Sequence, residues 1–303
     1  MNNYTHLLLT LTLPIVIICG CGFLLQVFRK QVDSKLLADI ALYLLAPALL
    51  FSTLSKAHIS GTNVLHILLF TLIMTAALWV TSLLIARWTH LPEKTKSVLT
   101  LTTLFSNANN YGLPVLLLAY GSPGFALGAV YVIGQIILVN LLGLYIAARA
   151  KLSGRAAARR MLKTPLIYAC IAGTACNVLH VSVPAGAGAA LTMLGGAYPV
   201  IVLVILGSRL ARTPIRGVMR RDVWSGVFMR LMVAPMIAKA ALMLLGIHGM
   251  LASVLFVEAS MPAAVNVVML TEKFDGDSKL ASLIVTVTTL LSFAYLPAVI
   301  AMG

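Results

Sequence analysis

Uncharged apolar stretches follow one another along almost the whole chain, and each is about as long as a membrane-spanning helix. The first of them, residues 5–28, contains no Asp, Glu, Lys or Arg. Hydrophobic residues make up 60% of the 303 residues and charged residues 10%, whereas a soluble domain has about 25% charged residues. Since one span takes about 20 residues, these stretches predict an all-α integral membrane protein with no separate soluble catalytic domain.

Hydropathy and the positions of Gly and Pro predict ten transmembrane helices. Most of the expected connections are short, and the longest are the basic stretches around residues 151–163 and 209–221. The expected spans are residues 5–28, 35–56, 63–88, 95–120, 124–149, 164–181, 187–209, 222–247, 249–272 and 279–301.

The placement of Lys and Arg predicts the orientation, because positively charged loops stay on the cytoplasmic side. Nineteen of the 22 Lys and Arg residues fall in the odd-numbered connections. The even-numbered connections and both termini hold only Lys56, while Arg230 and Lys239 fall inside the eighth expected span. We therefore expect a multi-pass protein of the plasma membrane with both termini outside. The net charge of +14 is then explained by these loops, and we expect no nucleic-acid partner.

Prolines suggest that the chain consists of two related halves. Pro47 and Pro114 lie 67 residues apart in the second and fourth expected spans, and Pro199 and Pro262 lie 63 residues apart in the seventh and ninth. Because proline removes a backbone donor and clashes with the preceding turn, we expect each to mark a kink or break. Halves of five spans begin on opposite sides of the bilayer, so the pattern predicts an inverted repeat. The halves would be residues 1–150 and 164–303, joined by a basic cytoplasmic linker, residues 151–163.

The fourth expected span carries a polar cluster near the middle of the bilayer. Asn107, Asn109 and Asn110 precede Gly112 and Pro114, which we expect to break the helix there. Freed backbone groups in hydrocarbon must line a cavity or find protein partners, and asparagine offers both donors and an acceptor to a polar ligand. This pattern predicts a substrate site. The alternative is that these amides join neighbouring helices.

The ninth expected span repeats the arrangement with an acid. Glu258 stands four residues before Pro262, and Asn266 follows one turn later. A carboxyl this deep is expected to be neutral or paired, which makes Glu258 a candidate for proton or ion coupling. A structural acid bonded to the other broken helix is the alternative. Amides at residues 113–115 and 261–263 would carry partial positive charge and favour a carboxylate-bearing substrate.

Other side chains give weaker indications. Arg230 is a possible partner of Glu258 or of an anionic substrate if it faces the interior, although it lies where it could also reach the interface by snorkelling. Neither the four cysteines nor the six histidines show metal-ligand spacing, and no nucleotide-binding or hydrolase motif is present. We therefore expect no cofactor, no metal and no enzyme activity.

Three segments resemble the auxin efflux carrier family, which includes plant PIN carriers and bacterial carriers of malonate or malate. They are SNANNYGLPVLLLAYG (residues 106–121), EASMPAAVNVVMLTEKFDGD (258–277) and LYLLAPALLFSTLS (42–55). The resemblance covers essentially the whole chain, but the long central loop of plant PIN carriers is absent, as in short prokaryotic-type members.

The resemblance implies a specific architecture. Spans 1, 2, 6 and 7 would form a scaffold, and spans 3–5 and 8–10 a transport domain in which broken spans four and nine cross. It also implies elevator-like alternating access and a homodimer. An asparagine before the fourth-span proline contacts the substrate carboxylate in PIN carriers, and Asn109 or Asn110 matches that position.

These observations favour a secondary active transporter of small organic anions, such as auxin-like, malonate-type or malate-type carboxylates. Coupling to protons or sodium is left open. One alternative is a sodium-coupled carrier of the related bile-acid type. Another is a channel or sensor that retains the carrier fold.

Overall fold

The computed structural model describes residues 6–29, 34–57, 59–88, 92–143, 146, 165–213 and 216–303, and the expected linker 151–163 lies outside them. The regular secondary structure of the described residues is helical, and their only extended pairing is one isolated bridge between Ser106 and Ala263. The prediction of an all-α protein is therefore confirmed for this part of the chain.

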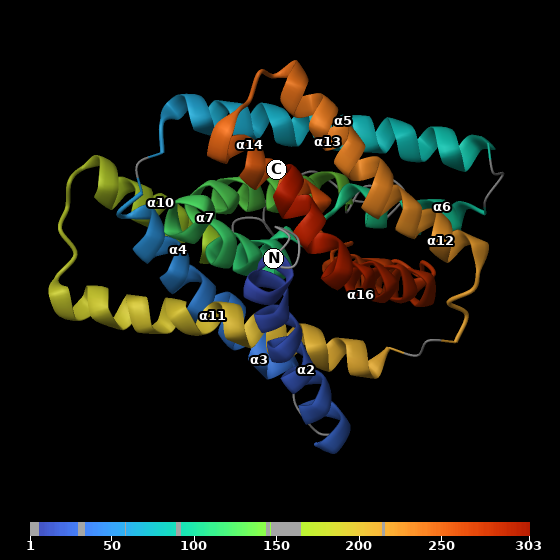
Figure 1. Cartoon of the computed structure of the whole chain (residues 1–303), viewed down its shortest axis with the longest axis horizontal. Helices are drawn as coiled ribbons and strands as arrows, with labels where there is room; N and C mark the ends of the chain where they lie inside the picture. Colours follow the sequence, from blue (N-terminus) through green and yellow to red (C-terminus); the bar gives the residue numbers. More distant parts are fainter. Residues whose placement is uncertain are drawn as a thin grey trace.

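The helices pack in two groups. In the first group, the N-terminal helices pack against two helices from the middle of the chain, along one side of the molecule in Figure 1. Its elements are the π-helical turn η1 (Leu8–Thr12), α2 (Leu13–Phe28), α3 (Ser34–Ile40), the π-helical turn η2 (Ala41–Leu45), α4 (Ala46–Leu54), α10 (Pro165–Val178) and α11 (Ala185–Arg212).

The second group holds the remaining elements, with α5 along the opposite side of the view from α11 (Figure 1). Its first half contains α5 (Gly61–Trp88), α6 (Glu93–Leu104), η3 (Ala108–Gly112), α7 (Leu113–Leu138) and η4 (Val139–Gly143). Its second half contains α12 (Arg221–Phe228), η5 (Met229–Val233), α13 (Ala234–Leu244), α14 (Gly249–Ser260), α15 (Asn266–Lys273) and α16 (Ser278–Met302).

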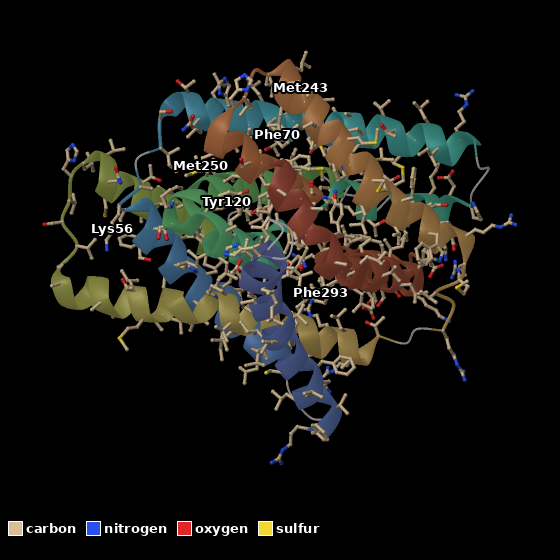
Figure 2. All side chains as sticks on the ribbon, in the orientation of Figure 1. Lys56, Phe70, Tyr120, Met243, Met250 and Phe293 are labelled. Atoms are coloured by element: carbon tan, nitrogen blue, oxygen red, sulfur yellow. The ribbon has the colours of Figure 1, made fainter. Side chains whose placement is uncertain are left out.

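Seven helical stretches among the described residues are long and apolar enough to cross a membrane, and α10 and α14 are shorter apolar helices. Large apolar side chains face outward on many of them, including Phe28, Leu72, Met193, Met236 and Leu244. Figure 2 shows Met243 at the periphery, where it is 71% exposed, while Phe70 is fully buried between α5 and the rest of the group. An apolar exterior around a packed interior identifies a multi-pass membrane protein.

Four of the π-helical turns precede a proline by the same distance. Each of η1, η2, η3 and η5 ends two residues before a proline, respectively Pro14, Pro47, Pro114 and Pro235. A wider turn accommodates the missing proline donor and the bulk of its ring without ending the helix. The four prolines expected to mark a kink or break therefore differ: Pro262 lies in an interruption between α14 and α15, Pro47 and Pro114 follow π-helical turns, and Pro199 lies inside the unbroken α11.

The helices are instead interrupted at two other places. Residues 105–107, between α6 and η3, form the first interruption, and residues 261–265, between α14 and α15, form the second interruption. A separate reversal falls inside α7 at Gly121, where φ is 63°. Glycine adopts this left-handed conformation without a Cβ clash, and its position agrees with the predicted connection between the fourth and fifth spans.

Candidate functional site

The two interruptions are hydrogen-bonded to each other. The amide of Asn107 donates to the carbonyl oxygen of Pro262 at 2.8 Å, and the amide of Ala264 donates to the carbonyl oxygen of Phe105 at 2.9 Å. These bonds run in antiparallel sense and satisfy backbone groups that the helices leave free. The first interruption lies about two turns before the expected Gly112–Pro114 position, so the expected location of that break is corrected.

The interruption in the fourth expected span lies at residues 105–107, before Pro114, so this proline does not cause it. Beyond it, the backbone carbonyl of Asn107 accepts from the amides of Tyr111 and Gly112, so the second half-helix begins with the asparagines themselves. The amides of Ala108, Asn109 and Asn110 have no acceptor among the described residues. The free helix N-terminus is thus at these residues and not at residues 113–115.

Three of the predicted site residues line common cavities. Asn109, Asn110 and Asn266 line both a cavity of about 200 Å³ and an adjoining cavity of about 460 Å³. Asn107, which is 3% exposed, lines the smaller one. Residues 107–110 and 266 are therefore brought together from two distant segments, and their amide groups offer both donors and acceptors to a small polar molecule.

The asparagines are held by one another and by the first helix group. Asn109 Nδ2 donates to Asn110 Oδ1 at 3.2 Å. The hydroxyl of Tyr198, on α11, lies 3.0 Å from the backbone oxygen and 3.1 Å from the side-chain oxygen of Asn109, and it can donate to either. Asn110 Nδ2 has no acceptor among the described residues, so its two donors are available at the cavity wall.

The remaining residues predicted for the site lie behind it. Gly112 and Pro114 are buried and line neither cavity, and Pro262 contributes its carbonyl oxygen to Asn107. A Cβ at Gly112 would overlap Oε2 of Glu258, and one at Gly128 would lie 3.1 Å from Oε1. These two glycines therefore leave the space that the carboxyl group occupies.

Glu258 is a fully buried acid. Its side chain is 0% exposed, and neither carboxyl oxygen has a hydrogen-bond partner among the residues that the structure describes. An ionised carboxylate without partners in such a place would be strongly unfavourable. The group lies one layer behind the asparagine cavities, separated from them by the backbone around Gly112.

Arg230 faces the interior and does not snorkel. It is 1% exposed, with Nε donating to the carbonyl oxygen of Met261 and Nη1 donating to that of Thr103, both at 2.8 Å, and Nη2 donating to that of Ala259. These carbonyls belong to the ends of α6 and α14. No ion pair between Arg230 and Glu258 lies among the described contacts, so the charge partner of Arg230 is the backbone.

Sequence reasoning missed residues from other elements. Tyr198 contacts Asn109, Gln135 lines the smaller cavity, and Lys35, Asp39 and Arg209 line the larger one. A signal existed for Tyr198, which directly precedes the proline of the seventh expected span. Gln135 could have been noticed as an uncharged polar residue in an apolar stretch. The cavity wall formed by Lys35 and Arg209 depends on the packing of α3 against α11, which the sequence does not reveal.

A buried polar site inside an all-helical, multi-pass membrane protein is typical of transporters. A family model described as "membrane transport protein" matches residues 7–157 and 149–300. The chain belongs to this family, the auxin efflux carrier family.

Curated relatives agree with this assignment. The chain is 28% identical over 290 residues to an uncharacterized transporter of Methanothermobacter thermautotrophicus, covering 94% of this chain and 95% of the relative. It is 26% identical over 290 residues to the uncharacterized transporter MJ1031 of Methanocaldococcus jannaschii, covering 92% and 94%. Both similarities extend along nearly the full length of the two chains compared.

Proposed function

We propose that this protein is a secondary active transporter of small organic anions, with carboxylates as its substrates. The observation that carries the proposal is the meeting of Asn109, Asn110 and Asn266 at two adjoining cavities. Asn110 Nδ2 and the free amides at the start of η3 are donors suited to carboxylate oxygens. Lys35, Asp39 and Arg209 line the larger cavity and give its wall a net positive charge, which favours an anion over a cation.

The proposed architecture has ten spans in two inverted halves, with the interrupted helices α6–η3 and α14–α15 crossing in the middle of the membrane. The first helix group would serve as the scaffold and the second as the moving transport domain of an elevator. The packing of the helices into two groups supports this division, and the bond from Tyr198 to Asn109 joins the two groups at the site. A homodimer through the scaffold and a plasma-membrane location with both termini outside complete the proposal.

Glu258 is the proposed coupling group, with protons as the favoured ion. The support is its complete burial beside the interrupted helices. A sodium-coupled mechanism of the bile-acid type is the alternative within the same class. Replacing sodium by choline in a flux assay separates the two, because sodium coupling requires flux to fall in choline.

The proposal is tested by counterflow in proteoliposomes loaded with a panel of mono- and dicarboxylates. Asn110→Ala removes two donors from the cavity wall, and we expect at least a tenfold rise in KM, since a hydrogen bond to a charged group contributes about 1.5–3 kcal/mol. Asn177→Ala is the matched control, because Asn177 donates to the carbonyls of Leu54 and Ala57 away from the cavities. It should lower stability and leave KM unchanged.

Two outcomes would contradict this function. Unchanged KM in Asn110→Ala across all transported acids would remove the proposed site. Unitary currents without counterflow would favour a channel that keeps the carrier fold.

A further inference from the structure

Carbonyl oxygens concentrate where α6 and α14 end. The last turn of a helix leaves carbonyls without intrahelical partners, and they carry partial negative charge. Thr103 lies in the last turn of α6, Ala259 in the last turn of α14, and Met261 directly after it. Two helix C-termini thus present their oxygens at one buried place inside the second helix group.

In transporters with broken helices, such carbonyls at half-helix ends are the groups that coordinate a coupling cation. Here the guanidinium of Arg230 donates to all three of them. Arginine is always charged in proteins and presents its donors in a rigid planar fork. The side chain is one of the largest fully buried side chains in the described part of the protein, so water does not compete for its donors.

We infer that Arg230 takes the place of a coupling sodium ion. Its guanidinium donates hydrogen bonds to the carbonyl oxygens at the ends of α6 and α14, so these oxygens do not coordinate sodium and transport does not require it. This inference rests on the proposed carrier function for its transport readout. Arg230 is a positioning residue in this scheme, since it lines neither asparagine cavity. It acts through α6, which ends three residues before Asn107, and through α14, which contains Glu258.

The electrostatics around the site support this assignment. Arg230 donates to the carbonyl oxygen of Ala259, the residue after Glu258. A sodium ion that used Glu258 together with these carbonyl oxygens would therefore have to approach the guanidinium, and like charges in a low-dielectric interior repel strongly. The hydroxyls of Thr103, Ser106 and Ser260 are also buried there. Together with Glu258 they could bind sodium only if the repulsion from Arg230 were overcome. A sodium site formed by these groups is the alternative that the experiment below tests.

The first arm of the experiment uses the wild-type protein and needs no variant. Purified protein is melted in sodium, potassium and choline chloride of equal ionic strength, and counterflow is measured in the same salts. We expect the same melting temperature and the same rate in all three salts. A sodium-specific rise in melting temperature, or a tenfold or greater dependence of the rate on sodium, would overturn the inference.

The second arm removes the guanidinium. Arg230→Ala should lower both melting temperature and transport, and methylguanidinium at millimolar concentration should restore part of each by binding in the vacated space. Tetramethylammonium, which carries charge but no donors, should restore neither. Arg230→Lys should retain more transport than the neutral Arg230→Met. Lys239→Met is the matched control, because Lys239 is an exposed cation further along the same membrane-spanning stretch.

The outcomes separate the two proposals. Wild-type transport and stability in Arg230→Met, or equal restoration by tetramethylammonium, would contradict the role of Arg230. If Arg230→Ala does not fold, the wild-type salt comparison decides alone. If the protein shows no carboxylate counterflow in any salt, the proposed function fails, while the melting temperatures still test whether sodium binds.

Discussion

At the residue scale, the central feature is a pair of buried ionisable side chains that do not pair with each other. Arg230 is bonded to backbone oxygens, and Glu258 lies against two glycines. The aromatic rings of Tyr111 and Tyr131 nearby are packed against Phe293 and Phe70, at centroid distances of 6.2 and 6.1 Å; Figure 2 labels both phenylalanines. Aromatic packing therefore fills the side of the site away from the cavities.

We predict that Gly112→Ala is destabilising, because its Cβ would overlap the Glu258 carboxyl group. Overpacking of this kind costs about 1–3 kcal/mol of the free energy of unfolding. Adding Glu258→Ala should remove the overlap, so thermal unfolding of the double variant should show less destabilisation than the sum of the two single changes. Gly196→Ala is the control, since a Cβ there meets no atom within 4 Å. Strict additivity would argue against the contact.

Glu258→Gln tests the proposed proton coupling. Glutamine keeps the size of the side chain and cannot release a proton, so we expect exchange at equal pH to persist while uptake driven by a pH gradient is lost. Tyr131 and Tyr198, the two ionisable side chains with an electrostatic interaction with Glu258, are unchanged in the variant. Glu272→Gln, at an exposed acid in the same expected span, should behave as wild type. Gradient-driven uptake that survives in Glu258→Gln would exclude this coupling role.

The sequence predicted which residues belong to the polar interior more reliably than it predicted their contact partners. Asparagines and a glutamate in apolar stretches have few explanations other than a polar interior, so Asn109, Asn110, Asn266 and Glu258 were identifiable. The partner of Arg230 was not, because three backbone oxygens leave no trace in the sequence. Gly112 was expected to break a helix, but its role depends on a side chain that lies 146 residues further along the chain.

At the element scale, glycines set how closely the helices of the first group approach. A Cβ at Gly22 on α2 would overlap the carbonyl oxygen of Val204 on α11, and a Cβ at Gly207 on α11 would overlap that of Cys19. Such close backbone contacts replace the hydrophobic effect as the source of helix association in lipid. The contact is reciprocal, since each helix supplies one glycine and one carbonyl.

We therefore predict that Gly22→Ala separates α2 from α11 and lowers stability by about 1–3 kcal/mol. Gly20→Ala on the same helix is the matched control, because a Cβ there meets nothing within 4 Å. Reversible thermal unfolding in detergent measures both. Equal losses for the two variants would mean that the general cost of substitution, and not this close contact, limits stability.

Helix positions followed from hydropathy, whereas the places where helices are interrupted did not. In lipid, the backbone N–H and C=O groups of a long uncharged stretch can find hydrogen-bond partners within a helix. The predicted spans accordingly agree well with α2, α5, α11 and α16. The interruptions depend on a competition between intrahelical bonds and bonds to a distant segment. The bonds of Asn107 to Pro262 and of Ala264 to Phe105 are long-range, and proline spacing alone placed one of the two interruptions wrongly.

At the scale of the whole molecule, the larger cavity lies between the two helix groups. Lys35 and Arg209 on its wall belong to connections expected to be cytoplasmic, and Asn109 and Asn266 come from the second group. This arrangement corresponds to a site open toward the cytoplasmic side under the proposed orientation.

Cysteine labelling tests this opening. We predict that Asn266→Cys, in a chain whose four native cysteines are replaced by Ala, reacts with a membrane-impermeant maleimide in inverted vesicles and is protected by a transported carboxylate. Ser292→Cys, at a position only 1% exposed, should stay unlabelled. Equal labelling of residue 266 from both faces of the membrane would contradict a site that is open to the cytoplasmic side and closed to the outside.

The main-chain bonds between the interruptions have a mechanical consequence. If α6 slid along α14 by one residue, both bonds would break together in a dry interior, and the guanidinium that bridges the two helix ends would lose its register. Axial sliding is therefore resisted at three points at once. Under the proposed elevator mechanism, both interrupted helices would therefore move together as one unit relative to α2 and α11.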